Sequence, residues 1–194
     1  MSSLSHDRLK PSFLLDTNVI SATARKRPPA GLKTWLAELG AIGDLCLCFP
    51  VMSEVRRGLV LCPDPEQARR IEQMLDDIEN AGFLHLKPRR DTEMIYASMM
   101  ATPALKHFWF PPSATKHWRI NHDPMIAAIA ITHEAIIITS DTDFKFIDRY
   151  FPLPGVYDPL LETWSVQPAE PVNLPELRKV DCEPLPIGMG CVPG

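Results

Sequence analysis

Short apolar runs that stop abruptly at polar residues constrain the fold of this chain more than any other feature. Phe13–Leu15 is followed at once by Asp16, and Ala135–Thr139 is followed by Ser140 and Asp141. A continuous apolar run without alternation is typical of a strand that is buried on both faces of a parallel sheet. Stretches with helical spacing separate these runs, so the sequence predicts an α/β fold with a central, mainly parallel sheet flanked by helices.

Acidic residues recur where the predicted strands end or where the next helix begins. A second strand, predicted over Leu45–Phe49, precedes a helix that opens at Pro50 and carries Glu54 in about its first turn. In a later helix Pro124 suits the first helical position, which makes Asp123 the natural N-cap. Each acid taken alone is explained by helix capping or by the helix dipole.

The recurrence of these acids favours a shared site over separate caps. The carboxyl ends of parallel strands meet at one edge of a sheet, where ligands bind in open α/β folds. Carboxylates brought together there repel one another unless a cation neutralises them. Oxygen ligands without a His or Cys cluster favour Mg²⁺ or Mn²⁺ over zinc, which indicates metal-assisted phosphodiester hydrolysis. The candidate residues are Asp16, Glu54, Asp123, Asp141 and Asp143.

Composition sets limits on partners and location. The 194 residues carry a net charge of -4, so there is no overall basic surface for tight nucleic-acid binding, although brief contact with RNA is compatible with it. The five cysteines are odd in number and lack metal-finger spacing, which fits a reducing cytoplasm. No apolar run has the length of a signal peptide core or a membrane span, so we expect a cytoplasmic protein without a membrane partner.

Two segments depart from the alternation of strands and helices. Residues 103–120 mix aromatic residues with Lys, His and Arg, which suits either base stacking and phosphate contacts or an apolar flap over the core or a subunit partner. Residues 1–162 are expected to form a single domain, and residues 163–194 a proline-rich extended tail. Exposed basic residues are more often merely solvated than functional. The candidates for RNA or partner contacts are Arg56, Lys87, Arg89, Arg90, Lys116 and Arg119.

Four segments resemble the acidic motifs of the PIN-domain ribonucleases. They are Leu15–Ser21, Ser53–Gly58, Asp123–Ala128 and Thr139–Phe144, which follow the family's order over roughly residues 12–160. Four motifs together are far more specific than any one of them. Within the family, the chain is most similar to the VapC-type and FitB-like toxins of type II toxin–antitoxin systems.

This resemblance implies a PIN-like three-layer α/β/α fold and a Mg²⁺- or Mn²⁺-dependent endoribonuclease. It also implies a homodimer, an RNA substrate, and a DNA-binding antitoxin with a segment that occupies the active groove. Asp143 would be an additional or supporting metal ligand, and Thr17, Asn18 and Thr139 would orient the carboxylates and water. The acids that the resemblance assigns to catalysis and to the metal are Asp16, Glu54, Asp123 and Asp141.

Two other functions are weighed against this one. An apolar strand that ends in Asp also begins the haloacid-dehalogenase-like Mg²⁺-dependent phosphatases. The pattern typical of those enzymes is Asp-x-Asp, whereas this chain has Asn18 in place of the second Asp. This difference counts against a phosphoaspartyl mechanism. A catalytically silent PIN-like protein-binding module is the second alternative. The cluster of like charges argues against it, because binding alone gives no reason to maintain such a cluster.

Overall fold

The computed structural model describes residues 10–110 and 121–178, which fold around a single six-stranded sheet. The strand order is β3-β2-β1-β4-β5-β6. Strands β1 to β5 pair in parallel, and β6 pairs with β5 in the antiparallel direction. The predicted mainly parallel sheet is therefore confirmed. The strands are β1 (Ser12–Leu15), β2 (Asp44–Cys48), β3 (Leu84–Leu86), β4 (Ile136–Ile138), β5 (Val156–Asp158) and β6 (Thr163–Val166).

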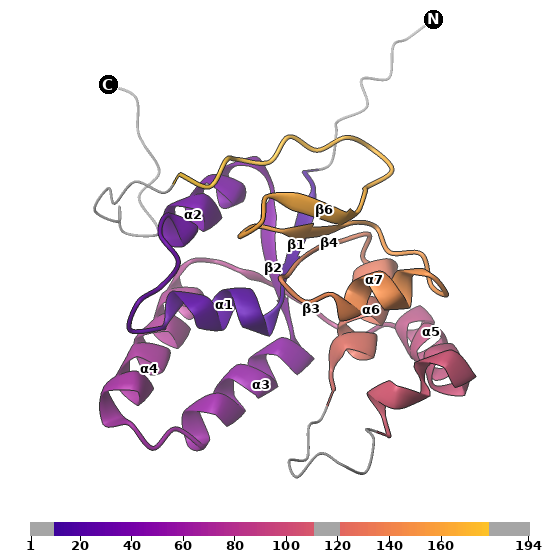
Figure 1. Ribbon diagram of the computed structural model, residues 1–194, viewed down its shortest axis with the longest axis horizontal. Helices are drawn as coiled ribbons and strands as arrows, with labels where there is room; N and C mark the ends of the chain where they lie inside the picture. Colours follow the sequence, from indigo (N-terminus) through magenta and orange to yellow (C-terminus); the bar gives the residue numbers. More distant parts are fainter. Residues whose placement is uncertain (1–9, 111–120, 179–194) are drawn as a thin grey trace, which may run out of the picture.

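Helices flank the sheet on both sides and give the α/β/α layering (Figure 1). In Figure 1, α1, α2 and α4 lie on the left of the sheet and α5, α6 and α7 on the right, while α3 contacts both α1 and α6. The helices are α1 (Thr17–Thr23), α2 (Leu32–Ile42), α3 (Phe49–Val60), α4 (Pro65–Asn80), α5 (Arg90–Ala101), the 3₁₀ helix η1 (Pro103–Phe108), α6 (Asp123–Thr132) and α7 (Asp143–Asp148).

The core lies along the central pair of strands, β1 and β4. Phe13 pairs with Ile136 and Leu14 with Ile137, and all four side chains are buried. Burying an aliphatic or aromatic side chain of this size stabilises the fold by about 1.5–3 kcal/mol. Helix α6 contacts β4 and contributes three fully buried alanines, whose small side chains allow close packing. The position of β4 is therefore fixed by apolar contacts from several sides.

The far part of the chain contains more structure than the sequence predicts. Strand β5 is followed by β6, which continues the sheet, so residues 163–166 belong to the sheet and not to the predicted extended tail. Strand β6 is an edge strand, which needs hydrogen bonds on one side only, and a proline-rich stretch follows it. The sequence therefore gives no clear strand pattern there. Residues 167–178 are irregular and return over α2, where the indole N–H of Trp35 donates to the carbonyl of Pro175 at 2.7 Å. Leu177 is buried there.

The aromatic and basic segment at residues 103–120 is described as far as residue 110. Its first part is η1, whose Leu105 and Phe108 are buried in the core. Lys116 and Arg119 lie outside the described residues. Over residues 10–110 and 121–178, no helix combines the length and the apolar character needed to cross a membrane.

Gly43 supports close contact between the end of α2 and the start of β1, and we expect Gly43→Ala to destabilise the fold. A Cβ at this position would lie 2.4 Å from the carbonyl oxygen of Pro11, which accepts a 2.9 Å hydrogen bond from the Asp44 amide, and 2.5 Å from the Phe13 ring. The free energy of unfolding in urea should fall by about 1–3 kcal/mol. Gly58→Ala is the matched control, because open space surrounds this helical glycine and alanine should stabilise α3 by up to about 1 kcal/mol. Equal stability of the two variants would contradict this account.

Candidate active site

The carboxyl edge of the sheet brings Asp16 next to the end of β4. Leu15 pairs with Ile138, and the backbone amide of Asp16 donates to the carbonyl of Ile138 at 3.1 Å. Asp16 is also the N-cap of α1, because its Oδ1 accepts a 2.7 Å hydrogen bond from the amide of Thr17. Capping and site formation therefore coexist in this residue. Its side chain is only 5% exposed.

The hydroxyl of Thr139 joins three parts of this edge. It donates to Oδ2 of Asp16 at 2.8 Å and accepts from the Asn18 side-chain amide and from the backbone amide of Asp141, each at 2.9 Å. A threonine hydroxyl has one donor hydrogen and two acceptor lone pairs, so its hydrogen-bonding capacity is used completely. Asn18 also accepts at 3.3 Å from the backbone amide of Ser140. These bonds fix the ends of β1 and β4 relative to each other.

Glu54 reaches the same edge from α3. Its Oε2 accepts a 2.9 Å hydrogen bond from the hydroxyl of Thr17. Helix α3 begins at Phe49, so Glu54 lies in the second turn and not in the first, as the sequence suggested. The helix starts early because Pro50 occupies one of its first positions, where the missing N–H is no loss.

Three acids form the tightest cluster at this edge. Single carboxylate oxygens of Asp123, Asp141 and Asp143 lie within 4.8 Å of one another, and the three residues are partly buried. Oδ1 of Asp141 accepts a 2.9 Å hydrogen bond from the amide of Asp143, which folds the turn between them. Such a set of oxygen donors is suited to a hard divalent cation. We call Asp123, Asp141 and Asp143 the acidic triad.

The structure corrects the predicted N-cap of α6. The helix begins at Asp123 itself, and the N-cap position is occupied by His122. The side chain of Asn121 accepts a 2.9 Å hydrogen bond from the amide of Asp123. Because Asn121 satisfies this backbone donor, the carboxylate of Asp123 is available to the acidic triad.

Burial and mutual repulsion shift the pKa values of these acids. Burial, with a smaller contribution from the charges of Glu54 and Asp141, raises the pKa of Asp16 to about 6, and the hydrogen bonds from Thr139 and Thr17 oppose this rise. The pKa of Asp123 is raised to about 8 by burial and by the charges of Asp16, Asp141 and Asp143. These mutual effects place all five acids in one electrostatic cluster. A cation would relieve the repulsion.

Most of the basic residues predicted to contact RNA or an antitoxin are not part of the cluster of five acids. Arg89 donates to the carbonyl of Thr132 and contacts the ring of His133, at the end of α6 that is opposite to Asp123. Helix α6 has 10 residues, which separates its two ends by about 15 Å at ~1.5 Å per residue.

The other basic residues described have different surroundings. The carbonyl of Lys87 contacts the same histidine as Arg89, and Arg90 begins α5. Arg56 forms an exposed 3.0 Å salt bridge with Glu79.

One buried acid at the same sheet edge was not identified from the sequence. Oδ1 of Asp158, at the end of β5, accepts hydrogen bonds from the Ser140 hydroxyl at 3.0 Å and from the amides of Leu160 and Leu161. Asp158 thereby holds the turn that precedes Asp141. The apolar residues before it are the signal that could have found it, because they repeat the pattern of a strand that ends in an acid.

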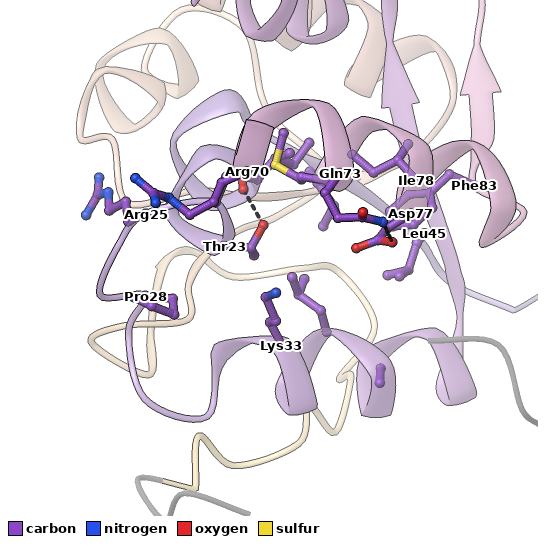
Figure 2. Close-up of a pocket in the computed structure, with 16 residues that line it drawn as sticks. Thr23, Arg25, Pro28, Lys33, Leu45, Arg70, Gln73, Asp77, Ile78 and Phe83 are labelled. Carbon is purple, nitrogen blue, oxygen red and sulfur yellow. Dashed lines mark hydrogen bonds between the residues drawn. The ribbon is translucent and has the colours of Figure 1, made fainter. Parts of the chain in front are cut away.

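A separate cavity of about 230 Å³ lies between α1, α2 and α4 (Figure 2). Its walls are mainly apolar and include Ile20, Leu36 and Met74. Three basic residues, Arg25, Lys33 and Arg70, also line it, together with one acid, Asp77. In Figure 2, Lys33 extends from α2 toward Thr23 on the opposite wall. We call this space the α1–α2–α4 cavity.

Several known proteins are similar to this chain in sequence or in structure. A plasmid stability protein, StbB of Pseudomonas syringae pv. tomato, is 30% identical over 130 residues, which cover 67% of this chain and 88% of that protein. The structure of VapBC2 from Rickettsia felis bound to a DNA fragment from their promoter matches with a TM-score of 0.52 and 18% identity, covering 70% of this chain and 92% of that chain. FitAcB from Neisseria gonorrhoeae is 26% identical, with a TM-score of 0.46 and coverage of 67% and 88%.

The fold and the site thus define an α/β protein with a carboxylate centre at the edge of a parallel sheet. The PIN domain family model matches residues 13–150, a range that contains all five acids. The chain belongs to the PIN domain family. Membership implies a nuclease type of hydrolase, which is consistent with the acidic triad.

Without a divalent cation, the chain should lose stability as the pH rises from about 4 to about 8. The folded state holds the proton of Asp123 up to a pKa of about 8, whereas the unfolded chain releases it near pH 4, so protonation favours the folded state and ionisation opposes it. Asp123→Asn should therefore be more stable than the wild type at pH 8 and should differ less from it at pH 4. Urea unfolding in the presence of a chelator measures both differences.

Asp76→Asn is the control for this measurement, because Asp76 is exposed on α4. Its effect on stability should be small and should not follow the same pH range. A wild type whose stability rises steadily from pH 4 to pH 8 in chelator would contradict the raised pKa of Asp123.

Proposed function

We propose that this protein is a Mg²⁺- or Mn²⁺-dependent endoribonuclease and the toxin of a toxin–antitoxin pair. The observation that carries the proposal is the cluster of five acids at one sheet edge, where three carboxylates lie within 4.8 Å of one another. Among the described residues, no salt bridge neutralises any of the five. Membership in the PIN domain family supports the nuclease part of the proposal.

The donor set fits a hard divalent cation. The acidic triad supplies carboxylate oxygens, and Asp16 and Glu54 lie close enough to contribute to the same electrostatic cluster. We assign catalysis and metal binding to Asp16, Glu54, Asp123 and Asp141, with Asp143 as an additional or supporting metal ligand. When bound, a divalent cation supplies an activated water and neutralises the charge that develops on a phosphodiester during hydrolysis.

The surrounding residues hold these carboxylates in place. Thr139 fixes Oδ2 of Asp16, Thr17 fixes Oε2 of Glu54, and Asn18 orients Thr139. Because Asn18 is bound to both Thr139 and Ser140, it occupies a positioning role and not that of a second acid in a phosphatase. Preorganised groups of this kind reduce the reorganisation needed during the reaction.

Cleavage of single-stranded RNA should require Mg²⁺ or Mn²⁺ and should stop when excess chelator is added. Thr139→Val removes the hydroxyl that orients Asp16 and should lower the cleavage rate by about 10–100-fold. Asp16→Asn and Asp141→Asn should lower it at least as much, whereas Asp76→Asn on the exposed surface of α4 should cleave at the wild-type rate. Gel assays with an end-labelled oligoribonucleotide measure all of these rates. Equal cleavage by Asp16→Asn, or in chelator, would contradict the metal-acid mechanism.

The α1–α2–α4 cavity supports the proposed antitoxin partner. Its apolar walls suit apolar side chains, and Arg25, Lys33 and Arg70 suit carboxylates on the same segment. The similarity to a plasmid stability protein supports the proposed toxin role. We propose that an apolar, acidic segment of the antitoxin binds in this cavity and extends toward the acids at the sheet edge. The homodimer rests on the family resemblance, and the molar mass from light scattering tests it.

Expression of the chain alone should arrest growth, and co-expression of the protein encoded by the neighbouring gene should relieve the arrest. Ala37→Glu places a bulky negative charge on the exposed wall of the cavity and should weaken this relief, while the isolated protein still cleaves RNA. Ala41→Glu is the matched control, because it introduces the same charge on the exposed surface of α2 outside the cavity. Growth arrest in neither strain, together with an absence of cleavage, would favour the silent binding module.

A further inference from the structure

A set of aromatic rings, two of them exposed and one partly buried, continues from the acidic triad along α7. Phe146 lies one helical turn after Asp143, and Tyr150 lies two residues beyond the end of the helix at Asp148. The ring of His107, on η1, packs against Phe146 at 5.2 Å between centroids, and Phe146 packs against Tyr150 at 5.6 Å. We define His107, Phe146, Arg149 and Tyr150 as the aromatic shelf. Figure 1 shows α7 beside α6, whose first residue is Asp123 of the triad.

The shelf is accessible and reaches the acids directly. Tyr150 is 46% exposed, and His107 and Arg149 are also exposed. His107 packs against Phe146, which lies one helical turn after Asp143 of the acidic triad. Helix α7 spans Asp143–Asp148, which corresponds to about 8 Å of helical rise at ~1.5 Å per residue, and Tyr150 lies two residues beyond its end.

Positive charge accompanies the rings. The guanidinium carbon of Arg149 lies 5.6 Å from the centre of the Phe146 ring, which holds the side chain over the shelf. On the η1 side, Nζ of Lys106 lies 6.0 Å from the centre of the Phe110 ring. Within residues 10–110 and 121–178, neither Arg149 nor Lys106 forms a salt bridge. Their charges are therefore available to an anionic ligand.

We propose that the aromatic shelf binds the single-stranded RNA that flanks the cleaved phosphodiester, with bases stacked on the rings and a phosphate held by Arg149. This inference rests on the proposed nuclease function and extends it by assigning the surface that holds the RNA beside the cleaved bond. Aromatic rings with adjacent cations are how proteins bind single strands, since every base has a face that can stack. Bases in a duplex are already stacked on one another, so the shelf selects against double-stranded RNA.

The charges favour RNA over a second copy of this chain as the occupant. The chain is acidic overall, with a net charge of -4, whereas the shelf carries Arg149 and Lys106 lies on the adjoining η1. RNA carries a phosphate at every nucleotide, so a strand stacked on the rings can present one of them to Arg149. A strand that lies there also leads directly to Asp143 and the rest of the acidic triad, which is continuous with the shelf.

The test measures binding of a fluorescent 12-nucleotide single-stranded RNA, and of the same sequence as a duplex, to the full-length chain. All proteins carry Asp16→Asn, so that the proposed cleavage does not interfere. Tyr150→Leu should weaken single-strand binding by about tenfold, and Tyr150→Phe should restore it because the ring remains. Arg149→Gln should lower the slope of log K against log salt by about 0.7. Arg69→Gln, which removes the same charge from the exposed surface of α4, should leave both quantities unchanged.

Cleavage by the wild-type sequence is measured separately, so that the two proposals can fail independently. Ring-dependent binding without metal-dependent cleavage supports the shelf and overturns the nuclease. If the wild type cleaves RNA in a metal-dependent way, and Tyr150→Leu binds and cleaves RNA as well as the wild type does, the shelf alone is overturned. Equal affinity for the duplex also overturns it. A change in oligomeric state in Tyr150→Leu, with RNA binding unchanged, would identify the shelf as a protein interface and overturn the inference.

Discussion

The parallel pairing of β1 with β4 is the interaction on which the site depends. These strands are distant in sequence, and only their register places Asp16 beside Thr139. The Thr139 hydroxyl then uses all of its hydrogen-bonding capacity to connect Asp16, Asn18 and Asp141. The apolar core under these residues supplies the stability that opposes the repulsion among the acids. A like-charged cluster persists here because the scaffold that carries it is buried and rigid.

The central part of this arrangement is readable in the sequence. The runs before Asp16 and Asp141 are continuous and apolar, so their burial in a parallel sheet follows from composition alone. Parallel strands deliver their carboxyl ends to one edge, and the acids were therefore expected to converge. The prediction of a mainly parallel sheet between helices was correct. The PIN domain resemblance, seen in four separate segments, was correct as well.

Details that depend on local geometry were harder to predict. Asp143 was expected to be an additional or supporting metal ligand, and the turn closed by Oδ1 of Asp141 explains how its carboxylate comes to lie beside Asp123 and Asp141. Asp123 was expected to cap α6, but Asn121 satisfies the relevant amide. The distance of Arg89 from the acids depends on how α5 packs against α6, which no local pattern encodes. Each of these differences concerns contacts made by side chains after the strands are in place.

The last part of the described chain acts as a brace for the site. Asp158 connects β5 to Ser140, and the Glu162 carboxylate that follows it accepts a 2.7 Å hydrogen bond from the amide of Leu177. Trp35 on α2 then holds the neighbouring Pro175. A continuous path of hydrogen bonds and backbone therefore runs from the turn before Asp141, around β6, to the helix that forms one wall of the α1–α2–α4 cavity. The last described residues therefore attach the helix beside the cavity to the same strand ends that carry the acids, so they belong to the folded domain and are not a separate appendage.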